Sequence, residues 1–319
     1  MKKIMVSVII PLQNQGGTVW QMTEKLKKEA PESAELILVD RGSSDDTVFR
    51  ALTALTREGL HGCVLQSGRG STMAAACQAG LSRAEGEFVC FLSHAERLPD
   101  GYLQTCLEKA TARDDIEMAF GYFYEGGTYT DPNTPQDDAP CRRGIDYLPA
   151  VFSGAFPLQM VQVLFRTDFL RQKSVYFHEE CACGFDEEFL YTALLRASRV
   201  QPVNWKLSVL KPCGLETATA AQCLQRVEAL LRVRDLADCT GSENLHMQQI
   251  MQKQVLPAAV MEYVDRMLDE GKSPFEVRRE LYRQGLNRYM RPGHETVPML
   301  RRRVKAFCSP FQAYRKKEK

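Results

Sequence analysis

Residues 36–47 of this 319-residue chain read Leu-Ile-Leu-Val-Asp-Arg-Gly-Ser-Ser-Asp-Asp-Thr. Four apolar residues lead into Asp40, and such a run predicts a strand buried on both faces, as in a parallel sheet. Gly42 and two serines then favour a turn, and the Asp-Asp-Thr that follows favours a helix start. Open α/β sheets bind ligands at the carboxyl ends of their strands. We therefore predict a nucleotide site at Asp40.

Strand-like and helix-like segments alternate over the first two thirds of the chain. The expected strands are residues 4–10, 35–39, 63–65, 87–92, 116–124, 162–165 and 205–209, and the expected helices are residues 18–29, 46–56, 72–83, 99–112 and 186–196. This order predicts right-handed βαβ units and a mostly parallel sheet flanked by helices. Residues 125–150 read as a long polar loop, and the pattern is helical from about residue 216, with a capping box opening at Ser273.

Composition narrows the class of protein. The net charge of +1 gives no overall attraction to nucleic acid, so no nucleic-acid partner is expected. No apolar stretch approaches the roughly 18–20 residues that span a bilayer, and we interpret residues 4–10 as a first strand rather than a signal segment. The 11 cysteines are odd in number and lie mostly in apolar segments, which favours free thiols in a reducing cytoplasm.

Five segments in order resemble the family 2 glycosyltransferases of the GT-A fold, which invert the anomeric centre and use nucleotide sugars. They are residues 6–14, 39–45, 70–88, 91–100 and 177–189. The resemblance implies an α/β, Rossmann-like GT-A domain over residues 1–212 and an α-helical C-terminal region with a basic tail over residues 213–319. It also implies transfer from a nucleotide-sugar donor, a uridine diphosphate sugar first, to a glycan or lipid-linked acceptor in polysaccharide biosynthesis.

The resemblance also assigns site residues. Those matched to the nucleotide pocket are Pro11, Gln13, Asn14, Asp40, Gly70, Gln78, Ser93 and His94. Asp40 would contact the base. Gln13 stands where the family often has an aromatic residue, and Cys77-Gln78 stands where it commonly has Arg-Asn. Arg69 is a neighbouring cation that could replace the lost arginine charge.

The segment matched to the family's metal site departs from its pattern. Where the family has Asp-x-Asp, which holds a divalent cation against the diphosphate, this chain has Ser93-His94-Ala95-Glu96. His94 and Glu96 could still hold Mn²⁺ or Mg²⁺, since imidazole and carboxylate both suit Mn²⁺ moderately. The alternative is a surface histidine and a helix-leading glutamate that bind no metal.

Asp186 falls at the family's general-base position, where a carboxylate takes the proton of the attacking acceptor hydroxyl. Asp186 could also be the N-cap of the helix that follows; both roles can hold at once, and the catalytic role is favoured. Glu179 matches an acidic position that would shape the acceptor side.

Other interpretations stay open. A catalytically impaired relative could keep the fold as a nucleotide-binding or scaffolding subunit, and an unrelated nucleotide-binding or redox protein is disfavoured because no Gly-x-Gly-x-x-Gly follows the first strand. His178, Cys181 and Cys183 read as structural residues rather than half of a zinc site. The basic tail, residues 301–317, is either a peripheral contact with the inner face of an anionic membrane or a solvated segment.

Overall fold

The computed structural model describes residues 3–92, 101–124, 140–208, 218–238, 245–291 and 298–308. Contacts divide the chain into two compact units. The first comprises Met1–Asp146, Pro157–Ala182 and Phe189–Lys211, and the second comprises Tyr147–Phe156, Cys183–Glu188 and Pro212–Lys319. Each unit is described by itself below.

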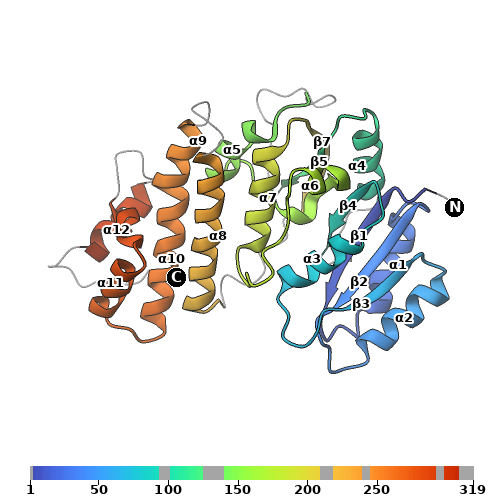
Figure 1. Ribbon diagram of the computed structural model, residues 1–319, viewed down its shortest axis with the longest axis horizontal. Helices are drawn as coiled ribbons and strands as arrows, with labels where there is room; N and C mark the ends of the chain where they lie inside the picture. The colour runs from blue at the N-terminus through green and yellow to red at the C-terminus, as the bar shows by residue number, and fades with distance from the viewer. Residues whose placement is uncertain are drawn as a thin grey trace. The chain divides into compact units, whose positions relative to one another are not determined.

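The first unit is built on a seven-stranded sheet of order β3-β2-β1-β4-β6-β5-β7 (Figure 1). Its strands are β1 (Val6–Leu12), β2 (Ala34–Asp40), β3 (Gly62–Gln66), β4 (Phe88–Phe91), β5 (Met118–Tyr124), β6 (Val163–Arg166) and β7 (Val200–Ser208). All neighbouring pairs are parallel except those made by β6, which runs antiparallel to both β4 and β5. The mostly parallel sheet and its seven predicted strands are confirmed, although β7 begins at Val200 rather than at Trp205 and the direction of β6 was not predicted.

Helices accompany the strands, and most begin within two residues of the predicted positions. Those of the first unit are α1 (Val19–Glu29), α2 (Thr47–Glu58), α3 (Met73–Arg83), α4 (Tyr102–Thr111) and α6 (Thr167–Gln172). Two short 3₁₀ turns, η2 (Gly144–Asp146) and η3 (Met160–Gln162), also belong to it. Helix α7 (Phe185–Arg196) contributes residues to both units.

The sheet is apolar on both faces, as the unbroken apolar run in β2 requires. One face packs against α1, α2 and α4 and forms a single hydrophobic cluster with every second residue of β1, such as Val8 and Ile10. The other face carries an aromatic group in which the rings of Phe177 and Phe189 stack at 4.0 Å and Phe91 meets both edge-on. Close packing on both faces fixes the register of β1 and β2, so that Leu12 lies opposite Asp40.

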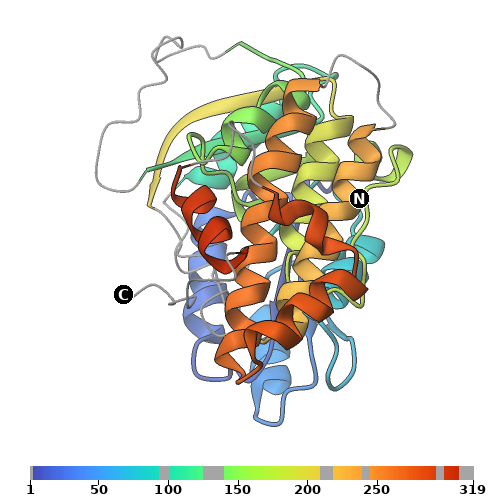
Figure 2. The ribbon, with the colours of Figure 1, turned by 90° about the vertical axis from the view of Figure 1, so that its left-hand side faces the viewer.

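The second unit is helical. It contains α5 (Leu148–Phe152), α8 (Ala220–Asp238), α9 (Leu245–Ile250), the π-helical turn η6 (Met251–Val255), α10 (Leu256–Asp269), α11 (Pro274–Arg283), the 3₁₀ turn η7 (Leu286–Met290) and α12 (Pro298–Cys308). Helices α8 and α10 lie side by side in Figures 1 and 2. The predicted capping box is confirmed, because Ser273 Oγ accepts from the Glu276 amide and Glu276 accepts from the Ser273 amide.

Two expectations change. The interval 125–150 is not a loop throughout, because η2 and the beginning of α5 fall inside it, while residues 125–139 lie outside the described part of the chain. In α12, Val304 and Phe307 of the basic tail are buried and face the helical unit, while residues 309–319 also lie outside the described ranges. Within those ranges, no helix is both long enough and apolar enough to cross a bilayer.

We expect the contact between α3 and β1 to be sensitive to added volume. A Cβ placed on Gly80 would lie 2.4 Å from Ile9 Cγ2, so Gly80→Val should lower the free energy of unfolding by about 2–3 kcal/mol through overpacking. Ala79→Val on the same helix is the control and should cost less than about 1 kcal/mol, the difference in helix propensity. Urea denaturation measures both, and equal losses would contradict the close packing.

Candidate functional site

The Asp40 carboxylate organises the turn that follows β2. Asp40 is buried, and its side chain accepts hydrogen bonds from the amides of Gly42 (3.1 Å) and Ser43 (3.2 Å) and from Ser43 Oγ (2.5 Å). Gly42 has φ +80°, which an L side chain adopts only with strain. The carboxylate therefore folds its own loop at the carboxyl edge of the sheet.

Asn14 joins this turn to the end of β1. Asn14 lies in the left-handed region at φ 52°, where asparagine is tolerated better than most residues. Its amide donates to Ser43 Oγ at 2.9 Å, and its Oδ1 accepts from the Ser44 amide at 2.8 Å. The two loops that follow β1 and β2 are thus held together by reciprocal bonds, with the Asn14 and Ser44 side chains facing solvent. We call these two loops, joined through Asn14, Asp40, Ser43 and Ser44, the clasp.

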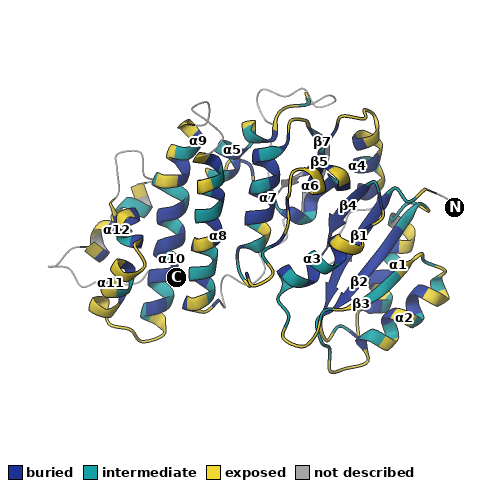
Figure 3. Cartoon of the chain, in the orientation of Figure 1, coloured by how far each residue is buried: buried dark blue, intermediate teal, exposed yellow. Residues whose placement is uncertain are grey.

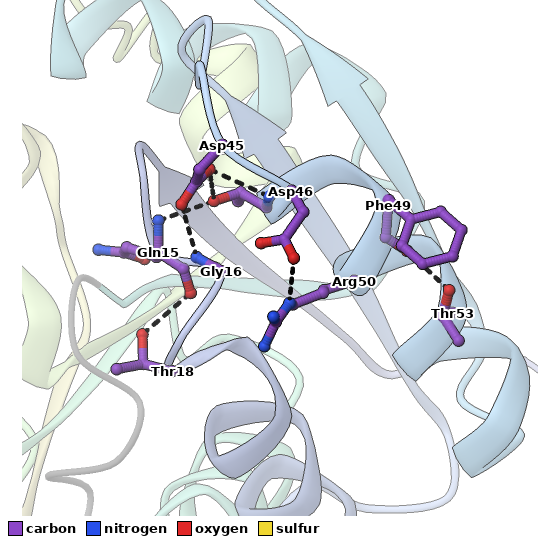
Figure 4. Close-up of polar contacts among 9 residues, drawn as sticks. Gln15, Gly16, Thr18, Asp45, Asp46, Phe49, Arg50 and Thr53 are labelled. Carbon is purple, nitrogen blue, oxygen red and sulfur yellow. Dashed lines mark hydrogen bonds and ion pairs between the residues drawn. The ribbon is translucent and has the colours of Figure 1, made fainter.

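A second set of hydrogen bonds extends the clasp to the start of α2 (Figure 4). The Gln15 amide donates to Thr47 Oγ1 at 2.7 Å, and the Gly16 amide donates to Asp45 Oδ2 at 3.1 Å. The hydrogen bond from Thr47 is the main cause that lowers the pKa of Asp45. This carboxylate stays ionised at neutral pH and keeps the first loop fixed to the second.

Two arginines flank the Asp40 turn. Arg41 donates from Nε and Nη2 to the Ser71 carbonyl at 3.0 and 2.9 Å, which joins the turn to the loop before α3. Burial lowers its pKa, and the nearby Cys77 thiol has the opposite, smaller effect. A Cβ on Gly42 would lie 2.7 Å from Arg69 Cγ, so the stem of Arg69 covers the other side of the turn. Sequence reasoning proposed Arg69 as a neighbouring cation and missed Arg41.

The remaining residues assigned to the nucleotide pocket have different environments. Pro11 is buried in β1, whereas Gln13 and Gly70 are exposed, Gly70 with φ +77°. Gln78 Oε1 accepts from the Phe177 amide at 2.9 Å, which ties α3 to the segment before α7. Ser93, His94 and Glu96 lie outside the described residues, and the described ones contain no group of three or more His, Cys, Asp or Glu side chains that could hold a metal ion.

Asp186 is the second residue of α7, which begins at Phe185, so it lies inside the first turn rather than at the N-cap. Asp186 is accessible to solvent, yet enough protein surrounds it that burial raises its pKa to about 6, and the Glu187 carboxylate adds to the rise. A carboxylate with such a pKa is ionised at neutral pH and is a stronger base than an ordinary aspartate.

The two glutamates that follow Asp186 are neutralised by arginines of α8. Glu187 makes a bidentate pair with Arg226 at 2.6 and 2.8 Å, and Arg226 also donates to Glu262 at 2.5 Å. Glu188 is buried and makes a bidentate pair with Arg232 at 2.6 and 2.7 Å. Among the described residues no salt bridge is found for Asp186. Of the three carboxylates in this first turn, it is therefore the one that no arginine neutralises.

A cavity and two cysteines are weaker candidates for a functional site. A cavity of about 310 Å³ opens at the opposite edge of the sheet, near the start of β5, but several of its charged side chains are already bound. Arg166 pairs with Glu87 at 2.7 Å, Arg199 lies 3.5 Å from Asp115, and Glu117 accepts from the backbone amides of Ser198 and Arg199. Cys181 and Cys183 are free thiols, and burial raises the pKa of Cys183 to about 12, so its thiolate is disfavoured.

Residues 7–185, more than half of the chain, match the family model described as Glycosyl transferase family 2. The chain belongs to glycosyl transferase family 2. This confirms the resemblance drawn from the five sequence segments, which lie within the matched range except for the first residue of the first segment and the last four residues of the fifth.

Solved structures of similar fold agree with this assignment. The structure of S. aureus TarS 1-349 in complex with UDP-GlcNAc has a TM-score of 0.63 and 18% sequence identity, over 90% of this chain and 80% of that one. The mannosyltransferase PcManGT from Pyrobaculum calidifontis, solved with GDP-Man and Mn²⁺, has a TM-score of 0.52 and 16% identity, over 96% and 84% of the two chains. The expected GT-A fold with a helical C-terminal region is confirmed.

Two curated relatives match over shorter stretches. Glycosyltransferase GlyG of Streptococcus pneumoniae serotype 4 is 23% identical over 120 residues, which are 38% of this chain and 39% of that protein. Dodecaprenyl-phosphate galacturonate synthase of Rhizobium johnstonii is 33% identical over 87 residues, 26% of each. The chain therefore spans less than half the length of the curated relatives it matches.

The Asp40 turn should depend on glycine at position 42. In Gly42→Ala the new Cβ would meet the Arg69 backbone at 2.6 Å at a left-handed φ, so we expect a loss of about 2–4 kcal/mol in the free energy of unfolding. Gly59→Ala, at φ +64° with open space around it, is the control and should lose about 1–2 kcal/mol. Urea denaturation compares them, and a Gly42→Ala variant as stable as the control would contradict the packed turn.

Proposed function

We propose that the chain transfers a sugar from a uridine diphosphate sugar to a glycan or lipid-linked acceptor, with inversion at the anomeric carbon. The observation that carries the proposal is the clasp at the carboxyl edge of β1 and β2, where Asp40 and Asn14 hold two loops in the position that α/β sheets use for nucleotides. Family membership supplies the reaction class. TarS, which binds UDP-GlcNAc, supports the choice of donor, and the relative named for dodecaprenyl phosphate supports a lipid-linked acceptor.

The nucleotide would lie against the exposed loops of this clasp. Gln13 and Asn14 offer amide groups to the nucleoside. The base would lie against the outer side of the Asp40 turn, whose carboxylate already accepts from the Gly42 and Ser43 amides. Arg41 and Arg69, on either side of the turn, bring positive charge toward a bound diphosphate. The family commonly has an arginine where this chain has the buried Cys77. In the proposal, Arg41 and Arg69 supply positive charge near that position.

In the proposed reaction Asp186 takes the proton of the acceptor hydroxyl. The acceptor oxygen then bonds to the anomeric carbon as the bond from that carbon to the diphosphate oxygen breaks, and the nucleoside diphosphate leaves with the electron pair. Because Arg226 and Arg232 engage Glu187 and Glu188, the proton passes to Asp186 rather than to a neighbouring carboxylate.

The donor set at positions 94 and 96 suits a divalent cation with mixed ligands. His94 offers a nitrogen and Glu96 an oxygen, a combination that favours Mn²⁺ over Mg²⁺. When bound there, the cation would neutralise charge on the departing diphosphate. PcManGT, solved with GDP-Man and Mn²⁺, supports this assignment.

The second candidate function is a nucleotide-binding or scaffolding subunit without transferase activity. The replacement of both aspartates of Asp-x-Asp and the burial of Cys77 at the arginine position favour it. In either function we propose that the protein acts in the cytoplasm, beside the inner face of the membrane, where lipid-linked acceptors are found.

Nucleotide binding should depend on Mn²⁺ through Glu96. Calorimetric titration of UDP into the protein should show at least about tenfold tighter binding with Mn²⁺ than with a chelator, because the cation bridges protein and diphosphate. Glu96→Ala should remove that difference, while Glu108→Ala on the exposed surface of α4 should keep it. Equal binding with and without the metal would refute the metal-assisted mechanism.

Asp186 should set the pH dependence of transfer. The base works when ionised and its pKa is about 6, so the rate should rise with pH through about 6 and level off above it. Glu187→Gln removes a like charge and should move the midpoint to lower pH, whereas Glu108→Gln should leave it in place.

Asp186→Asn should slow transfer by roughly 10²–10⁴-fold without weakening UDP binding. Turnover of uridine diphosphate sugars that Asp186→Asn abolishes would exclude the scaffolding function. Turnover that is unchanged in this variant would instead remove Asp186 from the mechanism.

A further inference from the structure

Positive charge is concentrated at the C-terminal end of an otherwise acidic chain. Residues 272–319 contain 14 Lys and Arg against 4 Asp and Glu, whereas the preceding 271 residues contain 27 against 36. Ten of those 14 cations belong to the described segment from Lys272 through α11, η7 and α12. The net charge of +1 therefore hides a strongly basic region within the helical unit.

Helix α11 combines this charge with exposed aromatic rings. Val277 and Leu281 are buried and anchor the helix, while Phe275 and Tyr282 are 76% and 74% exposed. The two rings are seven residues apart, which is two helical turns and about 10 Å, so they lie on the same side of the helix. Arg279 falls between them on that side, and Figure 3 shows exposed positions along α11. Arg278 instead donates to the Phe307 carbonyl of α12. We name Phe275, Arg279 and Tyr282 the α11 face.

The acidic residues of α11 are engaged within the helix. Glu276 accepts from Ser273 Oγ at 2.7 Å in the capping box. Glu280 pairs with Arg283 at 2.7 Å and also accepts from Gln284. The charge that the α11 face presents to a partner is therefore positive, and Lys272 adds to it just before the helix.

Helix α12 adds cations but no exposed aromatic ring among its described side chains. Val304 and Phe307 are buried, and the Arg278 guanidinium lies 5.4 Å from the centre of the Phe307 ring. Arg302 and Lys305 are exposed on the outside of the same helix. Among the described residues of α11 and α12, the exposed aromatic rings thus belong to α11.

We propose that the α11 face docks the protein onto a bilayer that exposes anionic lipid headgroups. Aromatic rings prefer the boundary between headgroups and acyl chains, and adjacent arginines bind the lipid phosphates. A nucleic acid fits less well, because the two rings stand on one helix rather than in a groove that follows a nucleic-acid strand. The proposal does not depend on nucleotide binding.

Vesicle binding of the full chain tests this surface. The protein is sedimented with vesicles of phosphatidylcholine alone or with one third phosphatidylglycerol, at low and at physiological salt. We expect binding to the anionic vesicles only, weakened by salt. Phe275→Ser and Tyr282→Ser should each reduce partitioning roughly tenfold, the effect of withdrawing one aromatic side chain from an apolar environment. Arg279→Glu should reduce it by at least about fivefold.

Matched controls lie on other helices. Phe49→Ser on α2 removes a ring that is 71% exposed, and Lys28→Glu on α1 reverses an exposed charge. Both should leave vesicle binding unchanged. In Phe275→Trp, tryptophan emission should shift to the blue on anionic vesicles and be quenched by brominated lipids, beyond the signal of the parent protein. UDP binding, measured in parallel, should be the same in every variant.

Three results would overturn the proposal. The first is no preference for anionic vesicles, and the second is equal loss of binding in the α2 and α11 variants. The third is a single-stranded or duplex oligonucleotide that binds through Phe275 and Arg279 and displaces the vesicles, which would assign the face to nucleic acid.

Discussion

The structure of the candidate site depends on one carboxylate that binds the loop beginning at its own residue. Asp40 ends a central strand, and the amides of Gly42 and Ser43 turn back to it. Further hydrogen bonds at this edge build on that turn. Ser43 Oγ accepts from the Asn14 amide, and the Ser44 amide donates to Asn14 Oδ1. Thr47 Oγ1 accepts from the Gln15 amide, and Arg41 donates to the Ser71 carbonyl in the loop before α3. Without the turn, three loops from three strands would lose their common anchor.

In this arrangement different residues support the loops and face a ligand. The buried Asp40 carboxylate holds backbone, while exposed side chains such as Gln13 and Asn14 remain for a ligand. Asp186 shows a similar separation, since Arg226 and Arg232 bind the two glutamates that follow it, while burial raises the pKa of Asp186 itself. In both places the carboxylates that support the structure are already bonded, and the chemistry is proposed for the groups that are left.

The sequence predicted the fold well because its strongest signals are local. The apolar run before Asp40 and the regular alternation of segments specify a parallel sheet with few alternatives. The antiparallel direction of β6 could not be predicted, because four apolar residues carry no information on strand direction. The same limit applies to Arg41. Its contact with Ser71 joins residues thirty positions apart, and no periodic pattern indicates it. Asp186 was placed near a helix start correctly, but its pKa depends on surroundings that only the folded chain assembles.

The reversed strand β6 has a consequence for how such a protein can diversify. Because β6 runs against β4 and β5, the chain leaves β5 and enters β6 at the same edge of the sheet, the edge at which Asp40 lies. The connection between Tyr124 and Val163 therefore begins and ends at that edge, although in its described part Arg142 pairs with Val200 at the start of β7. Its length and sequence can change without altering the order or the direction of the seven strands. Selection for a new acceptor could thus act on one contiguous stretch of the gene, while the strands that support the donor side stay as they are.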